Sequence, residues 1–326
     1  MKIGMVGSGK IVQTCLETFR HMEAVEGTAL CVRPQSREKG QALAREFSIP
    51  VVYTEYPKLL SDPSLDFIYI AIANHMHYTY ARQALEAGKN VILEKPFTAT
   101  ADEARALVEL AREKRLYLFE AITNLYSPAF KMMRQRLADL GEIKMMQCNY
   151  SQYSSRYDSY LKGEIASAFD PACAGGALYD INVYNLHLVI ALLGAPNEIQ
   201  YIATRGFNGI DTSGIVTMKY DRFTAECCGA KDSESPGHAI IQGTKGYMRI
   251  VGPPSLCPAL EIMIDGKQET FTDSSADRHM MAEFDAFEQM WRQGDLGQCM
   301  QKLEHSAVVM ESLYQARQHA GIPLHN

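Results

Sequence analysis

The sequence predicts an α/β protein in two parts, a doubly wound parallel sheet followed by an α/β domain with a large, open, mostly antiparallel sheet. Up to about residue 120, short apolar runs alternate with amphipathic segments, as strands and helices do in a parallel sheet. From about residue 141, strand-like runs follow one another with short turns, as in an antiparallel sheet. The 326 residues are enough for two domains, expected at 1–121 and 122–326.

The composition is that of an ordinary globular protein, with 47% hydrophobic and 21% charged residues. A net charge of -6 argues against a nucleic-acid partner, which would favour a basic face. No run reaches the roughly 18 to 20 apolar residues of a membrane span, and Met1 to Gly7 enters a strand without the apolar stretch of a signal peptide. We therefore expect a cytoplasmic protein with no membrane partner.

Eight cysteines are present, without a Cys-x-x-Cys pair or histidines at ligand spacing. We expect mostly buried thiols of a reduced protein and no metal. A zinc site built from ligands that converge in space is the alternative.

The first part should contain five strands and four helices. The expected strands are 2–6, 28–32, 67–73, 90–93 and 116–119, and the expected helices are 10–21, 36–47, 78–87 and 101–114. In such sheets, ligands bind beyond the carboxyl ends of the strands.

The first strand end carries two glycines, Gly7 and Gly9. They allow a tight turn that brings backbone N–H groups and the positive end of a helix against a pyrophosphate. Val12 stands where the dinucleotide fingerprint has its third glycine. A tight turn without a ligand is the alternative. The candidate cofactor-binding residues here are Gly7, Ser8, Gly9, Lys10 and Ile11.

The second strand end lacks the acidic residue that usually holds the ribose of NAD. Arg33 and Arg37 follow instead, and guanidinium groups suit a 2'-phosphate. The sequence therefore favours NADP over NAD, unless both arginines simply face solvent.

Polar residues also end the strands at 67–73 and 90–93. Asn74 and His77 fall where nicotinamide would lie, although the histidines here could equally cap the next helix. Glu94 and Lys95 precede Pro96, which disfavours helical geometry at the lysine. A cation there can orient a substrate hydroxyl, whereas taken alone it is an ordinary surface lysine.

The second part should contain eight strands, one long internal helix and two C-terminal helices. Asp265-Gly266 predicts a hairpin. Helices 278–293 and 297–320 are candidates to pack back on the first part. The expected strands are 144–150, 198–204, 213–220, 223–230, 238–243, 246–251, 261–264 and 268–271.

The internal helix, 178–193, follows Gly175-Gly176 and ends before Gly194 and Pro196. Asp180, Tyr184 and His187 are spaced four and three apart, on or near one face. A carboxylate, a phenol and an imidazole in a row suit proton transfer. The alternative is a partly buried helix whose polar groups bond to neighbouring strands.

These motifs together resemble the glucose-fructose oxidoreductase, inositol dehydrogenase and MocA family, Gfo/Idh/MocA, over nearly the whole chain. The shared features are the N-terminal Gly-x-Gly, Asn74-x-x-His77, Glu94-Lys95-Pro96, Glu120-Ala121 with Pro128, and the stretch from Gly175 to Tyr184. The resemblance implies a Rossmann domain joined to an α/β domain whose open sheet often forms a dimer interface. It also implies metal-free hydride transfer between nicotinamide and a carbinol carbon.

Roles of individual residues follow from the same resemblance. Lys95 contacts the cofactor and the reacting oxygen, Asp180 contacts the substrate and the lysine, and Tyr184 is the proton donor, as in the branch of dimeric dihydrodiol dehydrogenase. Asn124 and His187 are candidate substrate contacts. Three positions depart from the family pattern, Val12, Asn182 in place of a glycine, and Leu125 in place of an arginine, and the last two bear on the substrate.

The expected function is that of an oxidoreductase that uses NADP or NAD and acts on a sugar-like, polyol or cyclic diol substrate. The alternative is a catalytically silent dinucleotide-binding regulator of the same fold. A homo-oligomer, dimer or tetramer, formed through the second part is also expected.

Overall fold

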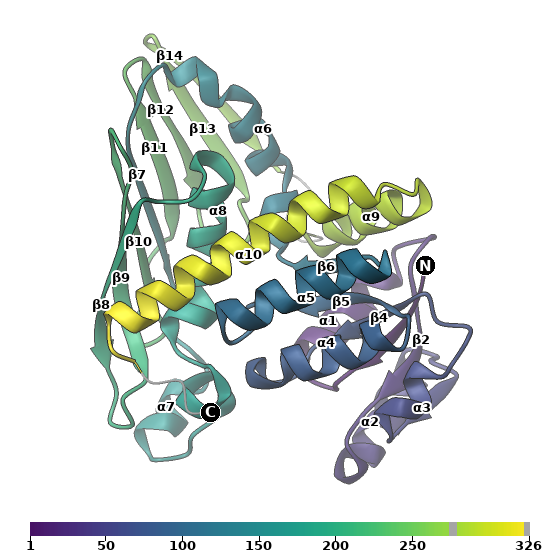
Figure 1. The fold of residues 1–326 in the computed structure, drawn as a ribbon. Coiled ribbons are helices and arrows are strands. Elements are labelled where there is room, and N and C mark those ends of the chain that lie inside the picture. Colours follow the sequence, from purple (N-terminus) through teal and green to yellow (C-terminus); the bar gives the residue numbers. More distant parts are fainter. Residues whose placement is uncertain (274–278, 323–326) are drawn as a thin grey trace. The chain divides into compact units, whose positions relative to one another are not determined.

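The computed structural model describes residues 1–273 and 279–322 (Figure 1). The chain divides into two compact units. Unit 1 comprises Met1–Ala121 and Met280–Ala307, and unit 2 comprises Ile122–His279 and Val308–Asn326.

Unit 1 contains a six-stranded sheet, all parallel, in the order β3-β2-β1-β4-β5-β6. This order confirms the doubly wound sheet and places a topological switch point between β1 and β4. The strands are β1 (Lys2–Val6), β2 (Glu26–Cys31), β3 (Val51–Tyr53), β4 (Phe67–Ile70), β5 (Asn90–Glu94) and β6 (Leu118–Ala121). The helices before β6 are α1 (Lys10–Phe19), α2 (Arg37–Glu46), α3 (Tyr56–Leu60), α4 (His77–Glu86) and α5 (Ala101–Lys114).

Helix α9 (His279–Arg292) adds to the core of unit 1 through aromatic contacts. Its Phe287 stacks on Phe119 with ring centroids 4.4 Å apart, and its Trp291 meets Phe67 edge-on at 5.7 Å. The predicted start of this helix, Arg278, lies outside the described residues. Helix α10 (Leu296–His319) begins in unit 1 and ends in unit 2.

Unit 2 is built on an eight-stranded sheet in the order β14-β13-β12-β11-β7-β10-β9-β8. Every neighbouring pair is antiparallel except β7 and β10, which confirms a large, mostly antiparallel sheet. The hairpin at Asp265-Gly266 is confirmed, with φ angles of 48° and 77°. The strands are β7 (Ile143–Ser151), β8 (Glu198–Arg205), β9 (Asp211–Lys219), β10 (Thr224–Ala230), β11 (His238–Gly243), β12 (Gly246–Val251), β13 (Ala259–Ile264) and β14 (Lys267–Thr272).

The two faces of this sheet differ. One face is covered by α6 (Pro128–Arg136), which contacts β12 and β13, and by α8 (Val183–Leu193), which contacts β7 and β10 (Figure 1). A short helix, α7 (Tyr157–Leu161), precedes α8. The strand register places four exposed apolar side chains on the opposite face, Met145, Ile202, Ile215 and Tyr247.

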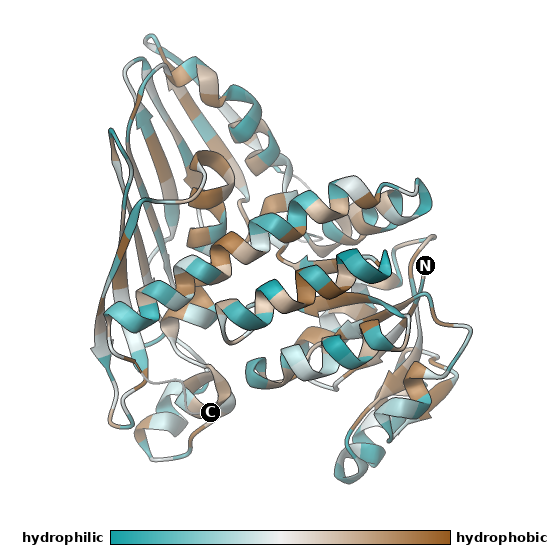
Figure 2. Cartoon of the chain, in the orientation of Figure 1, coloured by the Kyte–Doolittle hydropathy of each residue, from teal (hydrophilic) through white to brown (hydrophobic). Residues whose placement is uncertain are grey.

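The stretch Pro171–Leu193 is long and apolar enough to cross a membrane by length and composition alone, and its most apolar 18-residue window has a mean hydropathy of 1.3. Its most apolar window is 78% buried inside the protein, as in a core helix of a soluble protein. Figure 2 shows α8 as largely hydrophobic. One such helix is weak evidence for a membrane span.

Candidate active site

The turn after β1 has the backbone that the two glycines predict. Gly7 has a φ of 117°, and a Cβ atom there would lie 2.4 Å from the carbonyl oxygen of Ala71, just after β4. Gly9 is the N-cap of α1, and a Cβ atom there would have no protein atom within 4 Å. Val12, at the position of the third glycine of the fingerprint, is buried, and α1 forms with a valine at this position. Thus the backbone conformation and the nearby Ala71 oxygen require a glycine at position 7, whereas the space around Gly9 leaves room for a ligand.

The residues around this turn suit a dinucleotide. Ser8 is half-buried, and Lys10 and Ile11 are exposed on the first turn of α1. Arg33 and Arg37 follow β2 and are both exposed. A helix N-terminus attracts a pyrophosphate, and guanidinium groups form bidentate hydrogen bonds with phosphate. The residues therefore fit a nicotinamide dinucleotide, and the arginines fit one with a 2'-phosphate.

The ends of β4 and β5 are tied together by His77, at the first position of α4. Its side chain is fully buried, with Nδ1 2.9 Å from the carbonyl oxygen of Pro96 and Nε2 3.2 Å from that of Ile72. Burial lowers the pKa of His77 to about 4. Asn74 and Lys95 keep partial exposure. His77 thus supports the segment that carries Lys95, and its contact with the cofactor stays a prediction.

Glu94 points into a buried polar chain beneath this edge. The Tyr69 hydroxyl donates to Glu94 Oε1 at 2.5 Å, and Cys15 Sγ donates to the Tyr69 oxygen at 3.1 Å. Burial raises the pKa of Glu94 above its ordinary value, and it raises the pKa values of Tyr69 and Cys15 well above theirs. These hydrogen bonds anchor Glu94, the last residue of β5, directly before Lys95. Glu94 therefore contributes to the site by holding the backbone next to Lys95.

The predicted internal helix is confirmed, but it starts as a π-helical turn, Leu178–Asn182, before α8. From Leu178 to Ile190, Asp180 and Tyr184 are the two residues that keep exposed surface, and all the others are buried. His187 is fully buried, and its predicted contact with a substrate stays a prediction. The helical face therefore presents a carboxylate and a phenol, four residues apart.

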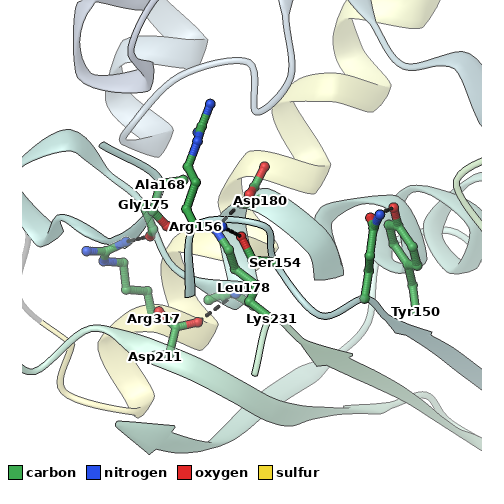
Figure 3. A network of polar contacts seen from close by, with 11 residues as sticks. Tyr150, Ser154, Arg156, Ala168, Gly175, Leu178, Asp180, Asp211, Lys231 and Arg317 are labelled. Carbon is green, nitrogen blue, oxygen red and sulfur yellow. Dashed lines mark hydrogen bonds and ion pairs between the residues drawn. The ribbon is translucent and has the colours of Figure 1, made fainter. Parts of the chain in front are cut away.

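The start of this helix is held by buried charges of unit 2 (Figure 3). Asp211 Oδ2 accepts from the Leu178 N–H at 2.6 Å, and Arg317 Nη1 donates to the Gly175 oxygen at 3.3 Å. Gly176 has a φ of 106°, and a Cβ atom there would lie 2.0 Å from Asp211 Oδ1. Gly176 is thus needed to let Asp211 reach the helix, whereas a Cβ atom at Gly175 would lie 2.6 Å from the Ser167 carbonyl oxygen.

Three asparagines fix the helix from its sides. Asn124 is buried and its Nδ2 donates to the carbonyl oxygen of Tyr184 at 3.0 Å. Asn182 and Asn185 donate to the carbonyl oxygens of Cys227 and Cys228 on β10, at 2.8 and 2.9 Å. Asn124 therefore positions Tyr184, and its predicted contact with the substrate stays a prediction. Asn182, in place of the family glycine, joins the π-helical turn to β10.

Sequence reasoning missed Lys231. Its ammonium donates to Asp180 Oδ2 at 2.7 Å and to the Ala168 oxygen at 2.7 Å (Figure 3). A lysine just after an apolar strand has no pattern that marks it as buried, and nothing in one sequence pairs it with a carboxylate 51 residues earlier.

The cysteines are mostly buried thiols, as predicted, with Cys173 and Cys228 partly exposed. Within residues 1–273 and 279–322, no three His, Cys, Asp or Glu side chains are grouped so that they could hold a metal ion. The expectation of metal-free chemistry stays a prediction.

A doubly wound sheet with a glycine turn after its first strand, followed by a mostly antiparallel sheet domain, is the architecture expected of a nicotinamide-dependent oxidoreductase. Two family models match consecutive parts of the chain and agree with this class. Residues 1–121 match the model "Oxidoreductase family, NAD-binding Rossmann fold", and residues 130–249 match "GFO/IDH/MocA C-terminal domain". The chain belongs to the Gfo/Idh/MocA family of oxidoreductases, as the motifs indicated.

Individual relatives extend this result. An uncharacterized oxidoreductase of Escherichia coli, YgjR, is 33% identical over 77% of this chain and 76% of its own. The NADP(+)-dependent scyllo-inositol 2-dehydrogenase IolU of Bacillus subtilis is 27% identical over 99% and 98%. A trans-1,2-dihydrobenzene-1,2-diol dehydrogenase of Sus scrofa is 28% identical over 85% and 81%.

The fold also matches solved structures. KijD10, a 3-ketoreductase from Actinomadura kijaniata in complex with NADP and TDP-benzene, superposes with a TM-score of 0.83. The match covers 98% of this chain and 97% of that one at 22% identity, so it supports the fold.

Proposed function

We propose that this chain is an NADP-preferring oxidoreductase that transfers a hydride between nicotinamide and a carbinol or carbonyl carbon of a sugar-like, polyol or cyclic diol substrate. The observation that carries the proposal is the exposure pattern of Leu178 to Ile190, where Asp180 and Tyr184 are partly exposed and every other residue is buried. A polar pair on an otherwise buried helix indicates a surface that meets a ligand. The named activities of IolU and the dihydrodiol dehydrogenase support this substrate range.

We assign the cofactor to unit 1 and the substrate to unit 2. Gly7, Ser8, Gly9, Lys10 and Ile11 would hold the pyrophosphate, Arg33 and Arg37 the 2'-phosphate, and Asn74 and His77 the region of the nicotinamide. When bound, the nicotinamide cofactor supplies or accepts the hydride.

Proton transfer is assigned to Tyr184, assisted by Lys95. In reduction, Tyr184 donates its proton to the carbonyl oxygen, and in oxidation it takes a proton from the hydroxyl. A free phenol has a pKa near 10, so this role needs a nearby ammonium to favour the phenolate. Lys95 has that task, and Asp180 accepts a hydrogen bond from the substrate.

The rival proposal is a dinucleotide-binding regulator without turnover. Retention of Lys95, Asp180 and Tyr184 favours the enzyme, because a pure binding protein has no need of a proton relay. The test follows the absorbance of reduced nicotinamide while the protein and NADP or NADPH meet a panel of polyols, aldoses, ketoses and aromatic trans-diols. Substrate-dependent turnover supports the enzyme. Tight NADPH binding with no turnover on any compound supports the regulator.

We also propose that the open face of the eight-stranded sheet joins copies of the chain into a dimer or tetramer. Ile202 and Ile215, 73% and 43% exposed, lie opposite each other on this face. Ile202→Glu with Ile215→Glu should convert the oligomer to a monomer in size-exclusion chromatography with light scattering, while Lys267→Met should not. A cytoplasmic location stays a prediction that cell fractionation tests.

A further inference from the structure

Lys231 is a fully buried cation attached to the candidate active site. It follows the last residue of β10 and is 1% exposed. Besides Asp180 and Ala168, its Nζ contacts the ring of Phe169, 4.4 Å from the centroid. Its backbone N–H donates to the Thr212 oxygen at 2.8 Å. Both ends of the residue are therefore fixed in place, and Figure 3 shows its side chain beside Asp180 and Ala168.

The ion pair is asymmetric. The side chain of Asp180 is 34% exposed, whereas that of Lys231 is 1% exposed. Removing an ammonium from water is costly, and apolar side chains of similar volume often stabilise a core equally well or better. Stability alone is therefore a weak reason for a lysine at this position. The buried ammonium of Lys231 thus contacts a carboxylate, that of Asp180, which is itself partly exposed to solvent.

This cation fixes the orientation of the Asp180 carboxylate, because Oδ2 accepts from the buried ammonium at 2.7 Å. An ordinary aspartate is ionised at neutral pH with or without such a partner, so the contribution of Lys231 is to orientation. An ionised carboxylate accepts hydrogen bonds and donates none. The substrate group that meets Asp180 must then be a donor, such as a hydroxyl. An ether oxygen or a deoxy carbon at that position would leave the carboxylate without its donor, which costs affinity for the transition state.

We propose that Lys231 is a positioning residue that holds the Asp180 carboxylate in a fixed orientation as a hydrogen-bond acceptor and so makes the enzyme select substrates with a free hydroxyl next to the reacting carbon. This inference rests on the proposed function, because it takes Asp180 as a contact of the substrate. It adds a specificity residue and a required substrate feature to that function.

The test is a selectivity ratio, kcat/KM for a substrate divided by kcat/KM for its deoxy or O-methyl counterpart at the neighbouring carbon. The ratio does not depend on the fraction of active protein, so a loss of folded enzyme alone would not change it. It is measured for the wild type, Lys231→Met, Asp180→Asn and the double variant. Methionine keeps a similar length without the charge. Lys267→Met, an exposed lysine on β14, is the matched control.

The expected wild-type ratio is at least about 10, the lower range for one hydrogen bond to a charged group. Lys231→Met and Asp180→Asn should each bring it to within about threefold of 1, and the double variant should lower it no further. The control should keep the wild-type ratio. NADPH affinity should stay within about twofold in all variants, since the residues proposed to hold the cofactor belong to unit 1.

Two results would overturn the inference while leaving the proposed function intact. One is a selectivity ratio for Lys231→Met that equals the ratio of the wild type. The other is a double variant in which the two effects multiply. Should Lys231→Met not fold, Lys231→Gln replaces it, and failure of both to fold while Asp180→Asn folds identifies Lys231 as a structural residue. A wild type with no turnover on any compound rejects the proposed function itself, and this inference with it.

Discussion

Replacing His77 tests how the edge that carries Lys95 is held. The buried imidazole lies between two backbone carbonyl groups, those of Pro96 and Ile72. A neutral imidazole has one N–H and can donate to only one of them, and the shorter contact, at 2.9 Å, favours Pro96. Hydrogen bonds to the carbonyls raise the pKa of His77, but burial outweighs them and brings it to about 4.

The sign and size of the effect follow from linkage. The ordinary pKa is 6.5 and the folded-state pKa is about 4, a gap that corresponds to roughly 3 kcal/mol. Because the folded-state pKa is depressed, the unfolded chain binds more protons between these values. The contribution to stability is therefore fully present above about pH 6.5 and is lost as the pH falls toward about 4.

The perturbation is His77→Gln, whose amide can still donate to Pro96 but cannot become charged. The free energy of unfolding is measured by urea titration of both proteins between about pH 7.5 and about pH 4.5. The advantage of the wild type should shrink by roughly 2 to 3 kcal/mol over this range, since other titrating groups cancel in the difference. In NMR, the imidazole signals of His77 are identified as those missing from the spectrum of the variant. At about pH 5.5 they should still be the signals of a neutral ring. Parallel unfolding curves, or a ring that titrates near its ordinary pKa, would refute the reasoning.

Three further predictions concern the cofactor turn, the choice of dinucleotide and the buried ion pair. Gly7→Ala should lower the free energy of unfolding by roughly 1 to 3 kcal/mol, because of the φ of 117° and the Ala71 oxygen, whereas Gly9→Ala should change it by less than about 1 kcal/mol. Both should weaken NADPH binding in a fluorescence titration, and an unaltered affinity in Gly9→Ala would remove the pyrophosphate from that position. Arg33→Ala and Arg37→Ala should each weaken NADPH binding about 10-fold or more and leave NADH unchanged, with the exposed Arg45→Ala on α2 as the control. NADH that binds the wild type as tightly as NADPH would contradict the two-arginine argument. Asp180→Asn should cost roughly 3 kcal/mol in urea unfolding, because Lys231 loses its carboxylate, and adding Lys231→Met should recover most of it. No recovery would mean that the pair is not the source of the loss.

Much of the fold was predictable because its signals are local. Helix α5 has the predicted bounds since the Thr100 hydroxyl accepts from the Glu103 N–H in a capping box. Strand β3 was missed because the three residues of Val51–Tyr53 are too few to show a period. The π-helical turn before α8 could not be foreseen. It depends on contacts with Asp211 and β10, far away in the sequence.

The candidate site was predictable where a motif fixes the backbone, and less so where burial decides the role. Gly7 has the positive φ that its motif implies. Residue spacing alone could not separate Asp180 and Tyr184 from His187, because the depth of each position depends on how α8 packs on β7 and β10. Lys231 was invisible for the same reason, since its burial and its partner are properties of the assembled sheet.

The most direct test of the central claim is the turnover of Tyr184→Phe on a substrate confirmed for the wild type. Phenylalanine keeps the ring, whose centroid lies 5.7 Å from that of Tyr150, and removes only the hydroxyl. We predict that kcat falls by about 100-fold or more, the range for a general acid–base, while NADPH binds as in the wild type. Full turnover in this variant would contradict the assignment of proton transfer to Tyr184.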